Sequence, residues 1–211
     1  MNELPPCYRC DHQPCECADG ITLYCADCLD VLPLLPKVDL VLTDPPYGIG
    51  YASQPTRYQR FNGKTPEAWD NSRPDMAPVL AMAPLLCVWG GNFFTLPISR
   101  GWLAWVSPDG PDSFSTVQLA WTNQDKVSRH IIQTTAATNK ERLGHPTQKP
   151  LVVMKFSIEY MPEAETILDP FTGSGTTLRA AKDLGRKAIG IEIEEKYCKI
   201  AAERLRQEVL F

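Results

Sequence analysis

The chain has 211 residues, of which 44% are hydrophobic and 22% are charged, and its formal net charge is −4. This length suits one full-sized domain, and the composition excludes both a mainly disordered chain and a uniformly basic protein that coats nucleic acid. Its apolar stretches are too short to span a bilayer, and the N-terminus has no basic segment followed by an apolar run. We therefore expect a cytoplasmic protein with no membrane partner.

Strands and helices are predicted to alternate along most of the chain. Residues 1–20 are rich in proline and cysteine and show no hydrophobic period, so we interpret them as an extension of a domain at 21–211. β-forming or continuous apolar runs predict strands at 21–27, 38–43, 85–89, 102–106, 117–122, 166–168 and 187–193. Helices are predicted at 28–35, 74–83, 91–98, 150–161, 174–184 and 194–208. Residues 44–73 and 126–149 show no regular period. This alternation predicts an α/β fold with a seven-stranded, mostly parallel sheet covered by helices on both faces.

A proline-rich tetrapeptide, Asp44-Pro45-Pro46-Tyr47, directly follows the strand predicted at 38–43. The two prolines fix the backbone and remove two N–H donors, which leaves rigid acceptors. The Asp44 carboxylate and the Pro45 carbonyl can then accept both N–H bonds of an exocyclic amino group, and Tyr47 offers a ring face to a planar base. The alternative is a structural turn in which Asp44 caps a nearby group.

A glycine-containing turn, DPFTGSGTT, spans residues 169–177 after the strand predicted at 166–168. Gly173 and Gly175 lie where a strand turns into a helix, and the missing Cβ lets a ligand approach the backbone there. Glu192 ends the next strand, where a carboxylate can bind the two hydroxyls of a ribose. Leu178 takes the place of a third glycine, so the turn favours a nucleoside over NAD. A purely structural turn is the alternative.

A third motif, HPTQKP at 145–150, leads into the helix predicted at 150–161 and is suited to holding an anion such as a carboxylate. In this order, the three motifs resemble those of amino-group DNA methyltransferases of the permuted type, in which the catalytic half precedes the cofactor half. The stretches ITLYCADCLDVLP, WGGNFF and VQLAWTN also resemble small phage-type adenine methylases, and the likeness extends over about residues 21–207.

The resemblance implies a Rossmann-like fold, S-adenosylmethionine as methyl donor and N6 of adenine in double-stranded DNA as acceptor. It also implies a bacterial or phage-infected cell and a homodimer. The strands before DPPY and DPFTG should be neighbours at the point where strand order reverses, so that Asp44 and Asp169 lie close together.

Residue roles follow from the same resemblance. The catalytic residues are expected to be Asp44, Pro45, Pro46 and Tyr47. Asp44 should orient the amine and not deprotonate it, because a carboxylate is a poor base for a neutral aromatic amine. The cofactor is expected to contact Asp27, Cys28, Asp44, Thr147, Gln148, Lys149, Asp169, Phe171, Gly173, Ser174, Gly175, Thr176 and Glu192.

Two regions, 48–73 and 107–149, are candidates for DNA recognition. Residues 126–155 contain six basic residues and one acidic residue, which suits contact with phosphates on one face of an otherwise acidic protein. A solvated loop is the alternative. The residues expected to bind DNA are Arg57, Arg60, Lys64, Lys126, Arg129, Lys140 and Arg142.

Six of the eight cysteines lie between Cys7 and Cys28. Disulfides are not expected in a reducing compartment. Cys7, Cys10, Cys15 and Cys17 can supply four thiolates to a structural zinc, with His12 as a substitute ligand. Free thiols are the alternative.

Other functions stay open at this point. N4-cytosine methylation uses the same geometry, although Asp in place of Ser at position 44 favours adenine. Methylation of RNA or of a protein amide is a second alternative. A catalytically inactive DNA-binding module with a zinc knuckle is a third, which the intact DPPY and DPFTGSGT motifs disfavour.

Overall fold

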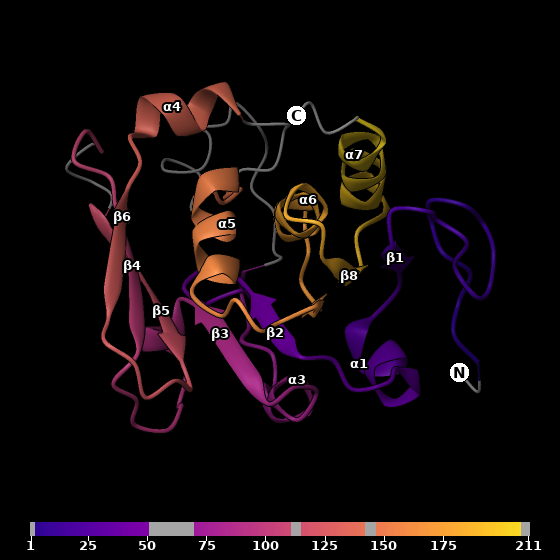
Figure 1. Cartoon of the computed structure of the whole chain (residues 1–211), viewed down its shortest axis with the longest axis horizontal. Helices are drawn as coiled ribbons and strands as arrows, with labels where there is room; N and C mark the ends of the chain where they lie inside the picture. Colours follow the sequence, from indigo (N-terminus) through magenta and orange to yellow (C-terminus); the bar gives the residue numbers. More distant parts are fainter. Residues whose placement is uncertain (1–2, 51–69, 111–114, 142–146, 208–211) are drawn as a thin grey trace.

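A mixed sheet runs through the computed structural model, which describes residues 3–50, 70–110, 115–141 and 147–207 (Figure 1). Within these residues the sheet has eight strands in the order β1-β8-β7-β2-β3-β5-β4-β6. Every neighbouring pair is parallel except the two that involve β5, which runs antiparallel to both β3 and β4. The strands are β1 (Ile21–Cys25), β2 (Leu40–Thr43), β3 (Leu85–Trp89), β4 (Trp102–Val106), β5 (Val117–Thr122), β6 (Arg129–Ile132), β7 (Thr166–Asp169) and β8 (Lys187–Glu192).

Helices cover both faces of the sheet, and each face has its own hydrophobic core. Side chains alternate across a strand, so Leu40 and Leu42 of β2 pack toward one core, whereas Val41 packs toward the other. The first core includes residues of α5 (Leu151–Glu159), α6 (Thr176–Asp183) and α7 (Glu195–Arg206). The second includes residues of α1 (Cys28–Val31), η1 (Leu32–Leu34) and α3 (Ala77–Leu80). The remaining short helices are η2 (Gly91–Phe93) and α4 (Thr135–Lys140).

The predicted α/β class and the cover on both faces are confirmed, and strands occur in all seven predicted places. The strand number was wrong, because β6 and α4 lie within 126–149, where the sequence shows no period. β6 is a short strand at the edge of the sheet with mostly exposed side chains, so it lacks the apolar alternation that predicts a strand. The helix expected at 91–98 is only the turn η2, and the one expected at 74–83 shortens to α3.

The strand order places the two acidic motifs together. β2 and β7 are parallel neighbours with Leu40 opposite Ile167 and Val41 opposite Leu168. β8 and β1 continue the sheet on one side and β3 on the other, so the strand order reverses between β2 and β7. Asp44 follows the end of β2, and Asp169 ends β7. Both therefore lie at the carboxyl edge of the sheet at the switch point, where open α/β sheets bind ligands.

The N-terminal extension runs beside the open edge of β1 (Figure 1). The Tyr8 N–H donates to the Leu23 carbonyl at 2.7 Å, so the extension continues the backbone pairing beyond β1. In the described parts of the chain, no helix is both long and apolar enough to cross a bilayer.

Candidate active site

A cavity of about 400 Å³ lies at the carboxyl edge of the sheet. Its walls come from the ends of β1, β2, β7 and β8 and from the loops that follow these strands. This volume lies within the range of small-molecule sites. The lining includes Asp27, Asp44, Asp169, Glu192 and Thr172, so several acidic and polar groups face one space.

The Asp169 side chain joins the strands and the helix next to the cavity through hydrogen bonds. It is buried and accepts hydrogen bonds from the Thr43 hydroxyl of β2 at 2.7 Å, the Phe171 N–H at 3.2 Å and the Thr177 hydroxyl of α6 at 2.5 Å. Burial raises the pKa of Asp169 to about 6, although these three donors favour the charged form. The Asp169 carboxyl thus joins β2, β7 and α6 and anchors the glycine-containing turn.

Glu192 fixes the other end of the turn. One carboxylate oxygen accepts the Gly173 N–H and the other accepts the Glu194 N–H, both at 2.8 Å. Gly173 has a φ of +52°, the left-handed region in which glycine is unstrained. Burial raises the pKa of Glu192. Each carboxylate oxygen keeps a further lone pair, so Glu192 can still accept from hydroxyl groups in the cavity that it lines.

Gly175 does not line the cavity, contrary to the expectation that it contacts a cofactor. It has a φ of +78° at the start of α6, and a Cβ built there would lie 2.8 Å from the Ala201 Cβ of α7. The glycine is therefore needed for the close packing of α6 on α7.

Ser174 and Thr176 do line the cavity, but both hydroxyls have partners within the protein. Ser174 donates to the Gln148 side-chain oxygen at 3.2 Å, and Thr176 accepts from the Arg204 guanidinium at 2.6 Å. Arg204, in α7, also donates to the Ser174 carbonyl at 3.3 Å. Burial lowers the pKa of Arg204 to about 10. Arg204 could not be predicted from a local motif, because it is 28 residues from its Thr176 partner.

Thr172 is a cavity residue that sequence reasoning missed. It is 6% exposed, and among the described residues its hydroxyl is a buried side-chain oxygen without a hydrogen-bond partner. A buried polar group of this kind costs free energy unless something bonds to it. Its place between Phe171 and Gly173 within the glycine-containing turn is the signal that identifies it. The Thr172 hydroxyl therefore points to a ligand that offers a hydrogen-bonding group.

The remaining residues expected to contact the cofactor lie either at the rim of the cavity or in its wall. Asp27 is exposed at the rim, where it caps α1 by accepting the Leu29 N–H at 2.9 Å. Cys28, Thr147, Gln148 and Phe171 also line the cavity. The Gln148 side-chain amide donates to the Glu141 carbonyl at 2.9 Å, which joins the HPTQKP segment to the end of α4. His145 of that motif lies outside the described residues.

The Asp44 carboxylate is held by two donors. Lys149 donates to one oxygen at 2.6 Å, and the Tyr47 hydroxyl donates to the other. The Lys149 ammonium is also 3.1 Å from the Tyr47 hydroxyl, and its side chain is only 6% exposed. Lys149, which was expected at the cofactor, lines the cavity, and the structure also joins it to the DPPY motif. Its charge offsets that of Asp44 in a confined site.

Tyr47 is packed within the protein. Its ring stacks on Phe93 with the centroids 4.8 Å apart, and it passes so close to Gly90 that any Cβ there would overlap it. Burial and the Asp44 charge raise the pKa of Tyr47 well above its ordinary value, so the hydroxyl stays a donor. Neither Tyr47 nor Pro45 lines the cavity, whereas Asp44 and Pro46 do. One face of the Tyr47 ring is thus taken by Phe93, and the Lys149 ammonium also lies 5.6 Å from the centroid of the Tyr47 ring.

Of the described residues expected to bind DNA, Lys126 and Arg129 lie away from the cavity. β5 runs antiparallel to β3, so Lys126, which follows β5, lies at the edge of the sheet opposite the cavity. Its ammonium is 3.5 Å from the Glu163 carboxylate there. Arg129 begins β6 opposite Leu103, at that same edge. β6 then returns the chain to the carboxyl edge, where α4 holds Lys140 (Figure 1). Arg57, Arg60, Lys64 and Arg142 lie outside the described residues.

Arg73 is a basic residue beside the catalytic motif that the sequence did not single out. It is exposed, and its guanidinium donates to the Tyr47 carbonyl at 2.9 Å. Asp70 supports the same loop by accepting the Gly48 N–H at 2.9 Å. Arg73 therefore places a positive charge at the entrance to the motif.

Comparison with known proteins identifies the class. Residues 83–203 match the N6/N4 methyltransferase family, described as DNA methylase. The putative methylase YubD of Escherichia coli is 31% identical over 207 residues, which are 85% of this chain and 87% of that protein. The chain therefore belongs to the N6/N4 DNA methylase family.

Type II methyltransferases match over shorter stretches. M.HinfI of Haemophilus influenzae is 38% identical over 103 residues, 45% of this chain and 29% of that protein. M2.LlaDCHI of Lactococcus lactis is 52% identical over 115 residues, 44% of this chain and 43% of that protein. The matched stretches thus span less than half the length of these relatives.

Solved structures share the fold. The PvuII DNA methyltransferase, described as cytosine-N4-specific, has a TM-score of 0.61 at 17% identity and covers 91% of this chain and 88% of its own. The complex of M1.HpyAVI with S-adenosylmethionine (SAM) has a TM-score of 0.59 at 22% identity and covers 89% of this chain and all of its own. These similarities establish a methyltransferase fold of the Rossmann-like type for this chain.

Asp169→Asn is expected to change how stability depends on pH. The folded-state pKa of about 6 lies above the unfolded value of 3.8. The protonated Asp169 therefore adds about 3 kcal/mol to the unfolding free energy of wild type relative to the variant. This contribution is fully present below about pH 4 and is lost as the pH rises through about 6. Urea unfolding at several pH values measures this difference. Parallel curves for the two proteins would contradict it.

Gly175→Ala is expected to destabilise the protein by about 3 kcal/mol, from left-handed backbone strain plus overlap with α7. Gly185→Ala is the matched control, because Gly185 has a φ of +68° with no atom within 4 Å of a built Cβ. It should cost only the strain, about 1 kcal/mol. Denaturant unfolding of both variants measures the difference, and equal losses would show that contact with Ala201 is not limiting.

Proposed function

We propose that this protein is a site-specific DNA methyltransferase that moves a methyl group from SAM to N6 of adenine. The observation that carries the proposal is the meeting of two motifs at one cavity. Asp44 and Asp169 follow neighbouring strands, and Thr43, directly before Asp44, bonds to the Asp169 carboxyl. A donor held by the second motif would thus face an acceptor held by the first.

The lining of the cavity fits the proposed cofactor. Glu192 has lone pairs left for the ribose hydroxyls, and Asp27 at the rim can accept from the adenine amino group. Phe171 supplies apolar surface for the adenine ring, and the Thr172 hydroxyl in the cavity wall has no hydrogen-bond partner of its own. When bound, SAM supplies a methyl group that its sulfonium already activates.

Asp44 would hold the target amine. A carboxylate offers about four lone-pair positions, and Lys149 and the Tyr47 hydroxyl occupy two, so the amine N–H bonds can still be accepted. Because Lys149 offsets its charge, Asp44 serves as an orienting acceptor and is not suited to removing a proton before attack. Positioning of this kind can supply on the order of 7–11 kcal/mol of the barrier. The amine becomes cationic on methylation, and its proton then leaves readily.

The target base must leave the duplex to reach Asp44, which costs a few kcal/mol. Contacts with phosphates must offset that cost. Arg73 beside the motif and Lys140 on α4 lie at the carboxyl edge and are the described residues placed for this role. Lys126 and Arg129 are not, because they lie at the opposite edge.

Asp at position 44 favours adenine over cytosine, which leaves N4-cytosine methylation as an outcome of the test. Transfer of tritiated methyl from SAM to duplex DNA, followed by nucleoside analysis, should give N6-methyladenine. N4-methylcytosine would correct the acceptor. Labelling of RNA or protein without DNA, or no transfer at all, would overturn the proposal.

Asp44→Ala is expected to lower methyl transfer by about 100-fold or more, because the amine loses its orienting acceptor. Binding of S-adenosylhomocysteine, measured by calorimetry, should change only a few-fold. Asp30→Ala, at an exposed position of α1, is the control and should keep full activity. Full transfer by Asp44→Ala would remove Asp44 from catalysis.

Lys149→Met keeps the length of the side chain but removes the charge beside Asp44. We expect kcat to fall by about 10-fold or more while the affinity for S-adenosylhomocysteine stays within a few-fold. Lys199→Met, on an exposed face of α7, is the matched control. Weaker cofactor binding with unchanged kcat would instead place Lys149 at the methionyl end of the cofactor.

A further inference from the structure

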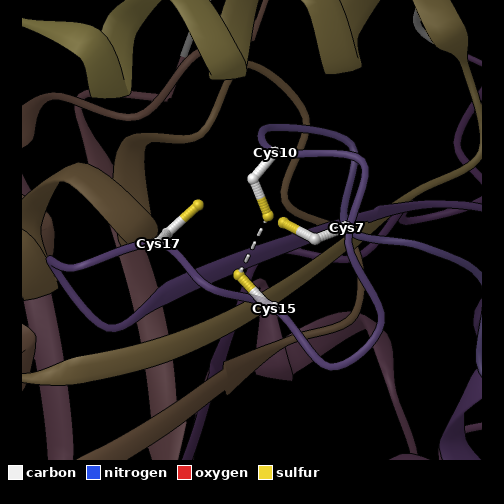
Figure 2. A group of neighbouring side chains, drawn as sticks. All are labelled: Cys7, Cys10, Cys15 and Cys17. Carbon is white, nitrogen blue, oxygen red and sulfur yellow. Dashed lines mark hydrogen bonds between the residues drawn. The ribbon is translucent and has the colours of Figure 1, made fainter.

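Four cysteine side chains of the N-terminal extension point toward a common centre beside β1 (Figure 2). The Sγ atoms of Cys7, Cys10, Cys15 and Cys17 all lie within 4.8 Å of one another. The Sγ atoms of Cys10 and Cys15 are 3.9 Å apart, which is far longer than a disulfide bond of about 2.05 Å. All four are free thiols. Within the described ranges, no other group of three or more histidine, cysteine or acidic residues gathers in this way.

We propose that these four thiols bind one structural zinc ion. Tetrahedral zinc with Zn–S bonds of about 2.3 Å places its sulfur ligands about 3.8 Å apart. The Cys10–Cys15 separation of 3.9 Å already meets this value, and the other sulfurs need only small side-chain rotations to reach it. A set of four sulfur ligands at tetrahedral spacing favours zinc over cations that prefer oxygen.

The backbone supports the two halves of the site in different ways. Between Cys7 and Cys10 the chain forms a tight turn, in which the Cys10 and Asp11 N–H groups donate to the Cys7 carbonyl at 3.3 and 2.7 Å. Asp11 has a φ of +59°, which reverses the chain after the second ligand. Cys15 and Cys17 are two residues apart, so an extended backbone directs both side chains to the same side. The close spacing of Cys15 and Cys17 is therefore compatible with one ion.

His12 is not needed as a ligand. Its imidazole lies 3.8 Å from the Glu16 carboxylate with more than half of the side chain exposed, and it is outside the four-sulfur group. The proposed site is a four-cysteine site.

The extension has little else to order it. It contains few apolar residues, and a segment this short cannot bury a core of its own without a disulfide or a metal. Leu4 and Tyr8 pack against the two cores of the domain, and further contacts that fix the extension are polar. Arg9 donates to the Asp19 carboxylate at 2.7 Å and to the Ile21 carbonyl at 2.6 Å, and Lys182 of α6 lies 3.2 Å from Asp19.

A zinc ion would hold these contacts together along the edge strand β1. β1 pairs with β8 on one side only, so its other edge would be open to pairing with a further chain. The extension covers that edge through the Tyr8–Leu23 bond. β1 leads directly to Asp27 at the rim of the cavity. The ion would thus stabilise the edge of the sheet that borders the cavity, without contacting the reacting groups.

Metal analysis of the full chain, purified without a histidine tag, tests the proposal independently of methyl transfer. Inductively coupled plasma mass spectrometry should find one zinc per chain. The double variant Cys10→Ser, Cys15→Ser should lose the metal. Cys25→Ser is the matched control, because Cys25 is a partly exposed thiol outside the four-sulfur group, and it should keep the metal.

A second measurement covers the case in which the double variant fails to fold. Modification of the wild-type thiols with a mercurial should release one equivalent of zinc to a colorimetric chelator, and cobalt should give the visible bands of a tetrahedral thiolate complex. Absence of metal from wild type, equal metal in wild type and a folded double variant, iron in place of zinc, or a disulfide among the four cysteines would each overturn the proposal.

Discussion

The parallel pairing of β2 with β7 is the constraint on which the rest of the site depends. It places the ends of two strands side by side, although Thr43 and Asp169 are 126 residues apart. The Thr43–Asp169 hydrogen bond joins the two motifs directly, and α6 is fixed to the same carboxyl through Thr177. The cavity, the glycine-containing turn and the catalytic motif all take their positions from this junction.

The junction also sets the electrostatics of the site. Burial raises the pKa of Asp169 although hydroxyl and N–H donors favour its charged form, whereas Asp44 has Lys149 as a counter-ion. The two carboxyls are therefore suited to different work. Asp169 holds β2, β7 and α6 together, and Asp44 presents, at the cavity wall, a hydrogen-bond acceptor whose charge Lys149 offsets. Thr172, with its unused hydroxyl, adds a polar group to that wall.

The sequence predicted the features that depend on local pattern. Continuous apolar runs predicted strands such as β2, and the motifs predicted that Asp44 and Asp169 would meet. Other features that depend on contacts between residues far apart in the sequence were not predicted. The Lys149–Asp44 pair joins residues 105 apart, and the packing of Gly175 depends on Ala201. The exposed edge strand β6 has no apolar period, and missing it hid the fact that Lys126 and Lys140 lie at opposite edges of the sheet.

We propose that one cavity holds the methyl donor against Asp44. A crystal structure of the protein with S-adenosylhomocysteine tests it most directly. The account predicts the ribose hydroxyls on Glu192 and the sulfur directed toward the Asp44 carboxylate. A ligand bound away from Glu192, or one whose sulfur points away from Asp44, would contradict it.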